Sequence, residues 1–194
     1  MILDELNEYA SPRDKLSRMV RDKAIFPIVK GLYETEAATP GYLLAGSIYG
    51  PSYLSFEFAL SYYGLIPEAV YTVTSATFEK KKKKRFKTAF GVFTYQDIPA
   101  GAFPLGINLL KEGAYACMIA SPEKAICDQL YKTKPITNQK RLQTFLLEDL
   151  RIEETEIKKL NVDDIVHLAK KYHSTNITRF SMMMQREKKH GYND

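Results

Sequence analysis

The chain has 194 residues and a formal net charge of +5 at pH 7, with 45% hydrophobic and 26% charged residues. This composition is that of a globular protein with room for one large domain, or for a small and a medium one. No apolar stretch reaches the about 20 residues that a membrane-spanning helix requires, which argues against a membrane protein. The mildly basic balance favours a polyanionic partner.

The N-terminus and the cysteines predict a cytoplasmic location. The first residues, Met1-Ile-Leu-Asp-Glu-Leu6, are acidic and lack the basic region of a signal peptide. Cys117 and Cys127 are too few for a disulfide scaffold. We therefore expect a reduced, cytoplasmic protein.

Residues 1–36 predict a small winged helix-turn-helix-like module. Residues 2–9 indicate a short helix, and a second helix runs from about Pro12 to Lys23, with proline at its first position. Residues 24–33 predict two short strands with a turn at Lys30-Gly31. In a winged helix the second helix of the pair enters the major groove, and the wing rests on the backbone or in the minor groove. The short front helix departs from a full winged helix.

The basic side chains of this module are the candidate DNA contacts. Leu16, Met19 and Val20 have the spacing of an inner helix face, which leaves the cations on another face. The alternative is an amphipathic helix with a solvated basic face. The predicted DNA-binding residues are Arg13, Lys15, Arg18, Arg21, Lys23 and Lys30.

Residues 37–194 predict a larger α+β domain. Helices are expected over residues 40–49 and 56–63, the second with Ser55 as its N-cap, and the chain from Ser121 onward is expected to be helical, with Ser121 and Asn161 as N-caps. Between them lie four strand-like segments, which predict a mostly antiparallel sheet packed with helices: residues 69–75, 86–95, 105–110 and 114–120. A hairpin turn is expected at residues 111–113.

Two further basic segments are candidate nucleic-acid or partner surfaces. One is the lysine run with the cations that follow it, and its alternative is a solvated loop. The other is the C-terminal helix of about residues 176–189, whose alternative is core plus solvated surface. The residues of the two surfaces are Lys80, Lys81, Lys82, Lys83, Lys84, Arg85, Lys87, Arg179 and Arg186. We expect Phe86, Phe90 and Phe93 to face the sheet core, which leaves base stacking on them as the alternative.

No pattern in the chain predicts catalysis, a metal or a cofactor. The three histidines lack partners at metal-ligand spacing, and no nucleophile elbow is present. A nucleotidyltransferase needs paired carboxylates on a strand, and no aspartate occurs between Asp22 and Asp97. A restriction-type nuclease remains an alternative, because Glu79-Lys80-Lys81 supplies one element of its site.

Three blocks resemble AbiEi-type antitoxins, the regulators of abortive-infection AbiE toxin–antitoxin systems. The first is Lys30-Gly-Leu-Tyr33, and the second is Pro51-Ser-Tyr-Leu-Ser55 with Ala59-Leu60 and Tyr63-Gly-Leu-Ile-Pro67. The third is Ala120-Ser-Pro-Glu-Lys-Ala-Ile-Cys-Asp128. The blocks occur in family order and span about two-thirds of the chain.

The resemblance implies a non-enzymatic antitoxin of the type IV class. Such a protein represses its own promoter by binding inverted repeats through its N-terminal module. Its larger domain opposes a nucleotidyltransferase toxin without forming a stable complex. The alternative is an interaction protein that binds the toxin or its RNA substrate through the lysine-rich sheet and the C-terminal helices.

Overall fold

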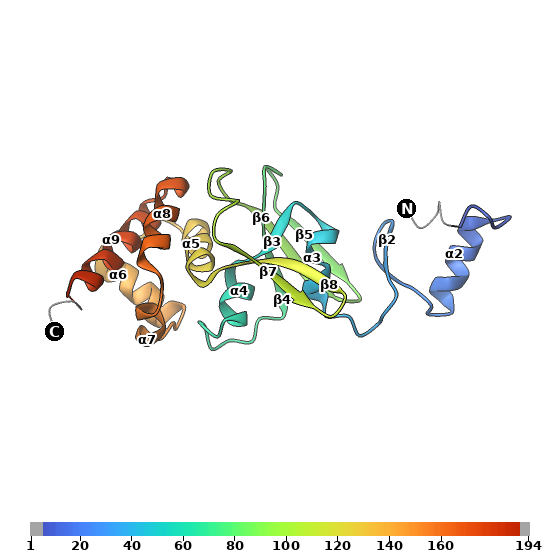
Figure 1. The fold of residues 1–194 in the computed structure, drawn as a ribbon, viewed down its shortest axis with the longest axis horizontal. Helices are drawn as coiled ribbons and strands as arrows, with labels where there is room; N and C mark the ends of the chain where they lie inside the picture. Colours follow the sequence, from blue (N-terminus) through green and yellow to red (C-terminus); the bar gives the residue numbers. More distant parts are fainter. Residues whose placement is uncertain (1–5, 191–194) are drawn as a thin grey trace.

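The computed structural model describes residues 6–190, which form an elongated molecule around a central sheet (Figure 1). The helix α2 lies at one end, and the helices α6 to α9 lie at the other. The helices are α2 (Pro12–Arg21), α3 (Gly41–Ile48), α4 (Phe56–Tyr62), α5 (Pro122–Lys132), α6 (Gln139–Thr144), the π-helical turn η1 (Phe145–Asp149), α7 (Glu154–Lys158), α8 (Val162–Tyr172) and α9 (Thr175–His190). No helix among residues 6–190 is long and apolar enough to cross a membrane.

The central sheet is mixed and has the strand order β5-β6-β4-β3-β8-β7. Its strands are β3 (Ser52–Leu54), β4 (Thr72–Thr77), β5 (Lys84–Thr88), β6 (Gly91–Asp97), β7 (Ile107–Glu112) and β8 (Tyr115–Ala120). Three of the five pairings are antiparallel, whereas β4 pairs with β6 and β3 pairs with β8 in parallel. The α+β class is confirmed. The sheet is more mixed than expected because the chain crosses over between hairpins.

Different helices cover the two faces of the sheet. Tyr95 donates a hydrogen bond to the carbonyl of Ala45 at 2.8 Å, which places α3 on the Tyr95 face. On the opposite face, the backbone N–H of Phe58 at the start of α4 donates to Thr74 Oγ1 at 3.0 Å. Because side chains alternate along a strand, neighbouring residues of β4 meet different helices.

The helical end is organised around α5, which is buried along most of its length. Its entry is the one predicted, because Ser121 Oγ accepts the N–H of Lys124 at 3.2 Å. The helix packs against α4 and α8, and α8 packs against α9. Asn176 at the start of α9 accepts from the N–H of Ile136 at 2.8 Å and fixes the loop after α5.

A buried polar network joins the second and third sequence blocks. Asp128 accepts hydrogen bonds from Tyr53 OH at 2.9 Å, from Ser55 Oγ at 2.6 Å and from Tyr172 OH. Lys124 Nζ lies 3.5 Å from Asp128 and donates to the carbonyl of Ala102 at 2.8 Å. Both charged side chains are fully buried. The network thereby ties β3, α5 and α8 together.

Two local predictions were wrong. Ser55 does not cap α4, because its hydroxyl is held by Asp128 instead. The segment of residues 86–95 is not one strand, since the chain reverses between β5 and β6 at Gly91, whose φ of +125° suits glycine. Phe93 is fully buried and Phe86 packs partly against the core, so their expected inward orientation is confirmed.

Only part of the expected winged helix is visible. The helix α2 and the antiparallel hairpin of β1 (Phe26–Val29) and β2 (Leu32–Glu34) are present as expected, with Gly31 at the turn. The described part of the front helix, residues 6–9, forms a turn, and residues 2–5 lie outside the described part of the chain. The winged helix therefore remains a prediction.

Candidate nucleic-acid interfaces

The helix α2 exposes most of its cations. Arg13, Arg18 and Arg21 are exposed, and none of the helix residues is buried. Lys15 is half-buried, with Nζ 4.8 Å from the centre of the Tyr9 ring. The structure thus places four of the six predicted DNA-binding residues on one helix with a largely solvated cationic face.

The two remaining predicted DNA contacts lie outside the helix. Lys23 follows α2 in a left-handed conformation (φ 56°) and is exposed. Lys30 is exposed in the turn between β1 and β2. The hairpin lies between α2 and the sheet in Figure 1, so cations are carried by both elements at this end of the molecule.

Glu34 anchors the hairpin to the sheet, a role that its sequence context did not reveal. Its carboxylate accepts from the N–H of Thr35 at 2.7 Å and from Tyr115 OH at 2.7 Å, at the start of β8. Burial would raise the pKa of Glu34, but the hydrogen bonds outweigh burial and lower the pKa. Phe26 adds an edge-to-face contact with Phe90, with ring centres 6.5 Å apart.

The lysine run forms a shaped loop that leads into the edge strand β5. Asp97 accepts the N–H of Lys81 and the hydroxyl of Thr77, each at 2.5 Å. Glu79 and Lys81 both have positive φ, so the loop turns sharply before β5. Lys80 differs from its neighbours, because it is half-buried with Nζ 5.2 Å from the Tyr49 ring centre.

The other cations of the run are exposed, and strand alternation divides those of β5 between the two sheet faces. The exposed residues are Lys81, Lys82, Lys83, Lys84, Arg85 and Lys87. Arg85 pairs with Thr94, which pairs with Thr74, so these three form one row across the sheet. Lys84 pairs with Tyr95 on the opposite face. Charged side chains on an edge strand also disfavour pairing with another chain.

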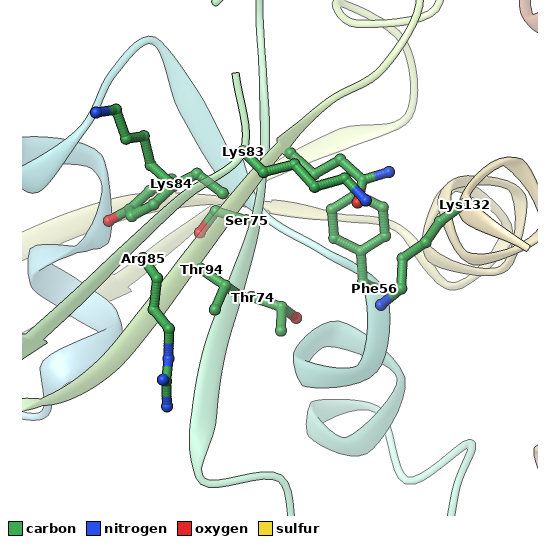
Figure 2. Close-up of a pocket in the computed structure, with 10 residues that line it drawn as sticks. Phe56, Thr74, Ser75, Lys83, Lys84, Arg85, Thr94 and Lys132 are labelled. Atoms are coloured by element: carbon green, nitrogen blue, oxygen red, sulfur yellow. The ribbon is translucent and has the colours of Figure 1, made fainter. Parts of the chain in front are cut away.

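A basic cavity of about 240 Å³ lies where this edge meets α4 and α5 (Figure 2). Thr74 and Thr94 come from the sheet, Phe56 comes from the start of α4, and Lys132 comes from the end of α5. Lys83 extends toward the Phe56 side, whereas Lys84 and Arg85 leave β5 in different directions. Among the described residues the lining contains four cations and no carboxylate, so the cavity favours an anion.

The two predicted surface residues of the C-terminal helix α9 lie in different environments. Arg179 is half-buried and donates to the carbonyl of Ile136 at 2.6 Å, which gives it a structural contact. Arg186 is exposed. The structure does not bring these residues to the β5 edge, because α9 lies at the helical end of the molecule.

The described residues contain no group of three or more His, Cys, Asp or Glu side chains that could hold a metal ion. Asp97, the strand acid near Glu79-Lys80-Lys81, uses both carboxylate oxygens in the hydrogen bonds that shape the loop. Comparison with known proteins adds no identity, since no family model and no curated protein matches the chain.

Proposed function

We propose that this chain is an antitoxin and transcriptional regulator of the AbiEi type that acts in the cytoplasm. Its N-terminal module binds promoter DNA with inverted repeats, and its larger domain counteracts a nucleotidyltransferase toxin without a stable complex. The observation that carries the DNA-binding part is α2, a helix with a solvated arginine face at one end of the molecule. The three sequence blocks supply the link to antitoxins.

The geometry of α2 supports recognition of a phosphate backbone and a groove. Within residues 6–190 no other helix covers α2, which leaves it free to approach a duplex, and the hairpin that carries Lys30 lies between α2 and the sheet, where a wing could contact the DNA. Arginines on such a helix pair with phosphates or with guanine edges. Each phosphate contact makes binding more sensitive to salt.

Gel-shift titrations with the chain's own promoter test this proposal. Arg18→Ala together with Arg21→Ala should weaken binding and reduce the slope of log K against log salt by about 2. The control is Lys170→Ala with Lys171→Ala, which removes the same charge at the exposed end of α8. An unchanged slope in the α2 variant, or an equal reduction in the control, would contradict DNA binding through α2.

A second candidate function uses the β5 edge instead of α2. The basic cavity and the exposed lysines beside it favour a non-enzymatic protein that binds the toxin or its RNA substrate. Replacement of Lys81, Lys82 and Lys84 by Gln should then weaken binding to single-stranded RNA, or reduce co-purification with the toxin. The result that contradicts this function is wild-type behaviour of the triple variant in both measurements.

A further inference from the structure

The basic cavity adjoins a second, chemically different cavity. The second cavity has a volume of about 630 Å³ and shares Thr74 and Lys132 with the first. It lies along α4, the start of β4 and the end of α5. Apolar atoms of Ile66, Val70 and Leu150 contribute to its walls. The two adjoining cavities are together called here the sheet groove.

Two residues that line the second cavity have hydrogen-bond acceptors without a partner in the described part of the chain. Gln129 is only 6% exposed, and its Oε1 has no hydrogen-bond partner within residues 6–190. Glu57 Oε2 is also buried without a partner in this part of the chain. The other ends of both groups are fixed, because Glu57 Oε1 accepts from Gln129 Nε2 at 3.2 Å and from Lys132. A buried acceptor without a donor is costly, so a donor supplied by a ligand would be favourable there.

The two ends of the sheet groove therefore select for opposite properties. Lys83 and Arg85 attract an anionic group at one end, whereas Lys132 is already paired with Glu57. The acceptors of Glu57 and Gln129 attract hydrogen-bond donors at the other end, beside an apolar wall. A molecule that carries a phosphate and a flat group with an amino substituent satisfies both ends.

The exposed ring of Tyr71 adds a third element at the same groove. Tyr71 lines the second cavity and is 90% exposed, the highest value among the large exposed hydrophobic side chains of the described residues. An aromatic ring with a free face stacks on any nucleobase. The second cavity has a volume in the range of small-molecule sites, and the first is slightly smaller than that range.

We infer that the sheet groove binds a nucleoside phosphate whose base carries an amino group. The phosphate lies at Lys83 and Arg85, the base amino group donates to Glu57 and Gln129, and Tyr71 stacks on the base. The nucleotide is either free or the terminal residue of an RNA strand. This inference is independent of DNA binding by α2, and it rests on the second candidate function only through its use of the β5 edge.

Calorimetric titration with adenosine 5′-diphosphate tests the inference on the full chain. The wild type should bind, and adenosine alone or pyrophosphate alone should bind at least about tenfold more weakly, because each fills one end. Uridine 5′-diphosphate should also bind about tenfold more weakly, since uracil has a carbonyl in place of an amino group and its single N3–H can donate to only one of the two acceptors. A 5′-phosphorylated RNA hexamer, compared with the unphosphorylated one, distinguishes a strand end from a free nucleotide.

A charge-matched pair of variants locates the phosphate. Lys83→Gln with Arg85→Gln should reduce affinity at least about tenfold. Lys81→Gln with Lys82→Gln, in the same loop but outside the cavity lining, should leave affinity within about threefold. Tyr71→Ala, an exposed position where folding is not at risk, should weaken nucleotide binding by about five- to tenfold and leave pyrophosphate binding unchanged.

Three results would overturn the inference. One is no binding of either the diphosphate or the hexamers at millimolar concentration. Another is equal loss in the two double variants, which would mean diffuse attraction to the lysine loop and would leave the second candidate function intact. The third is equal affinity for the adenosine and uridine compounds. Loss of promoter binding in the α2 variant with nucleotide binding unchanged would contradict only the DNA-binding proposal.

Discussion

Asp128→Asn should be among the most destabilising conservative changes in this chain. The variant keeps the size of the side chain and removes the charge that faces Lys124 in a fully buried site. An amide oxygen at the Oδ2 position still accepts from Tyr53 and Ser55. The amide nitrogen then faces the Lys124 ammonium, so two donors oppose each other, and the Tyr172 hydroxyl loses its acceptor.

The expected loss is about 3–5 kcal/mol, the usual cost of removing one partner of a buried ion pair. Domains have a free energy of unfolding of about 5–15 kcal/mol, so the loss is a large share of the total. For a chain of this length the loss lowers the melting temperature by about 6–20 °C. Urea unfolding followed by circular dichroism measures the loss, provided that the slope with urea is unchanged.

The pH dependence of the variant gives a second readout. Burial lowers the pKa of Lys124, and the charge of Asp128 opposes that effect. Without Asp128 the pKa of Lys124 in the folded state falls further below its unfolded value. At a pH between these two values, the unfolded state therefore binds more protons than the folded state. Stability then rises with pH toward the unfolded value of about 10.4, and the deficit relative to the wild type should narrow between pH 7 and pH 9.

The double variant Lys124→Met with Asp128→Asn is the control, because it removes both charges and keeps the amide oxygen that accepts from Tyr53 and Ser55. It should be more stable than Asp128→Asn. A loss below about 1 kcal/mol in Asp128→Asn would refute the reasoning, since Lys124 would then not depend on Asp128. A deficit that stays constant between pH 7 and pH 9 would refute the part that concerns Lys124 protonation.

Three further predictions concern other parts of the chain. Gly41→Ala should lower the free energy of unfolding by about 1–3 kcal/mol, because its Cβ would lie 2.1 Å from a backbone carbonyl oxygen of the β5–β6 turn. The control, Gly46→Ala in the same helix, meets no atom within 4 Å and should raise the free energy of unfolding by about 0.4–1 kcal/mol. Urea midpoints that shift in the same direction in the two variants would contradict the packing of α3. Burial raises the pKa of Cys117 to about 11 and also raises the pKa of Cys127. Neither thiol should therefore react with a disulfide reagent at pH 8 until guanidinium unfolds the chain. Fast reaction of either thiol in the folded protein would contradict its burial. Burial would raise the pKa of Glu57, but the hydrogen bond and charge of its lysine partner on α5 outweigh burial and lower the pKa. The contribution of Glu57 to stability is therefore present above the unfolded pKa of about 4.3 and is lost as the pH falls through the folded value. The difference in urea midpoint between the wild type and Glu57→Gln should accordingly shrink from pH 6 to pH 3.5.

The sequence predicted element boundaries best where the side chain at the boundary hydrogen-bonds the backbone of the same element. Ser121 and Asn161 cap α5 and α8 as expected. Ser55 has the same sequence signal, yet its hydroxyl bonds a carboxylate 73 positions away. A capping signal fails where a distant buried group competes for the same hydroxyl, and sequence spacing does not contain that competition.

Among the candidate surfaces, too, some could be predicted from the sequence and others could not. The exposure of Arg18, Arg21 and the lysines after position 80 could be predicted, because runs and stripes of cations are rarely buried. The sheet groove could not, since its residues come from β4, β5, β6, α4 and α5 and share no sequence pattern. Arg179 was predicted as surface, and only the loop after α5 made it a donor to a carbonyl.

By itself the sequence determined that the chain is an α+β protein with basic segments at α2 and before β5, and it determined the three blocks that resemble antitoxins. These properties follow from periodicity, capping and charge, which act over a few residues. The tertiary structure decided the mixed strand order, the buried Lys124–Asp128 pair and the union of a cationic and an acceptor-lined cavity. Each of these depends on which distant segments share a buried space, because burial changes the cost of leaving a charge or a polar atom without a partner.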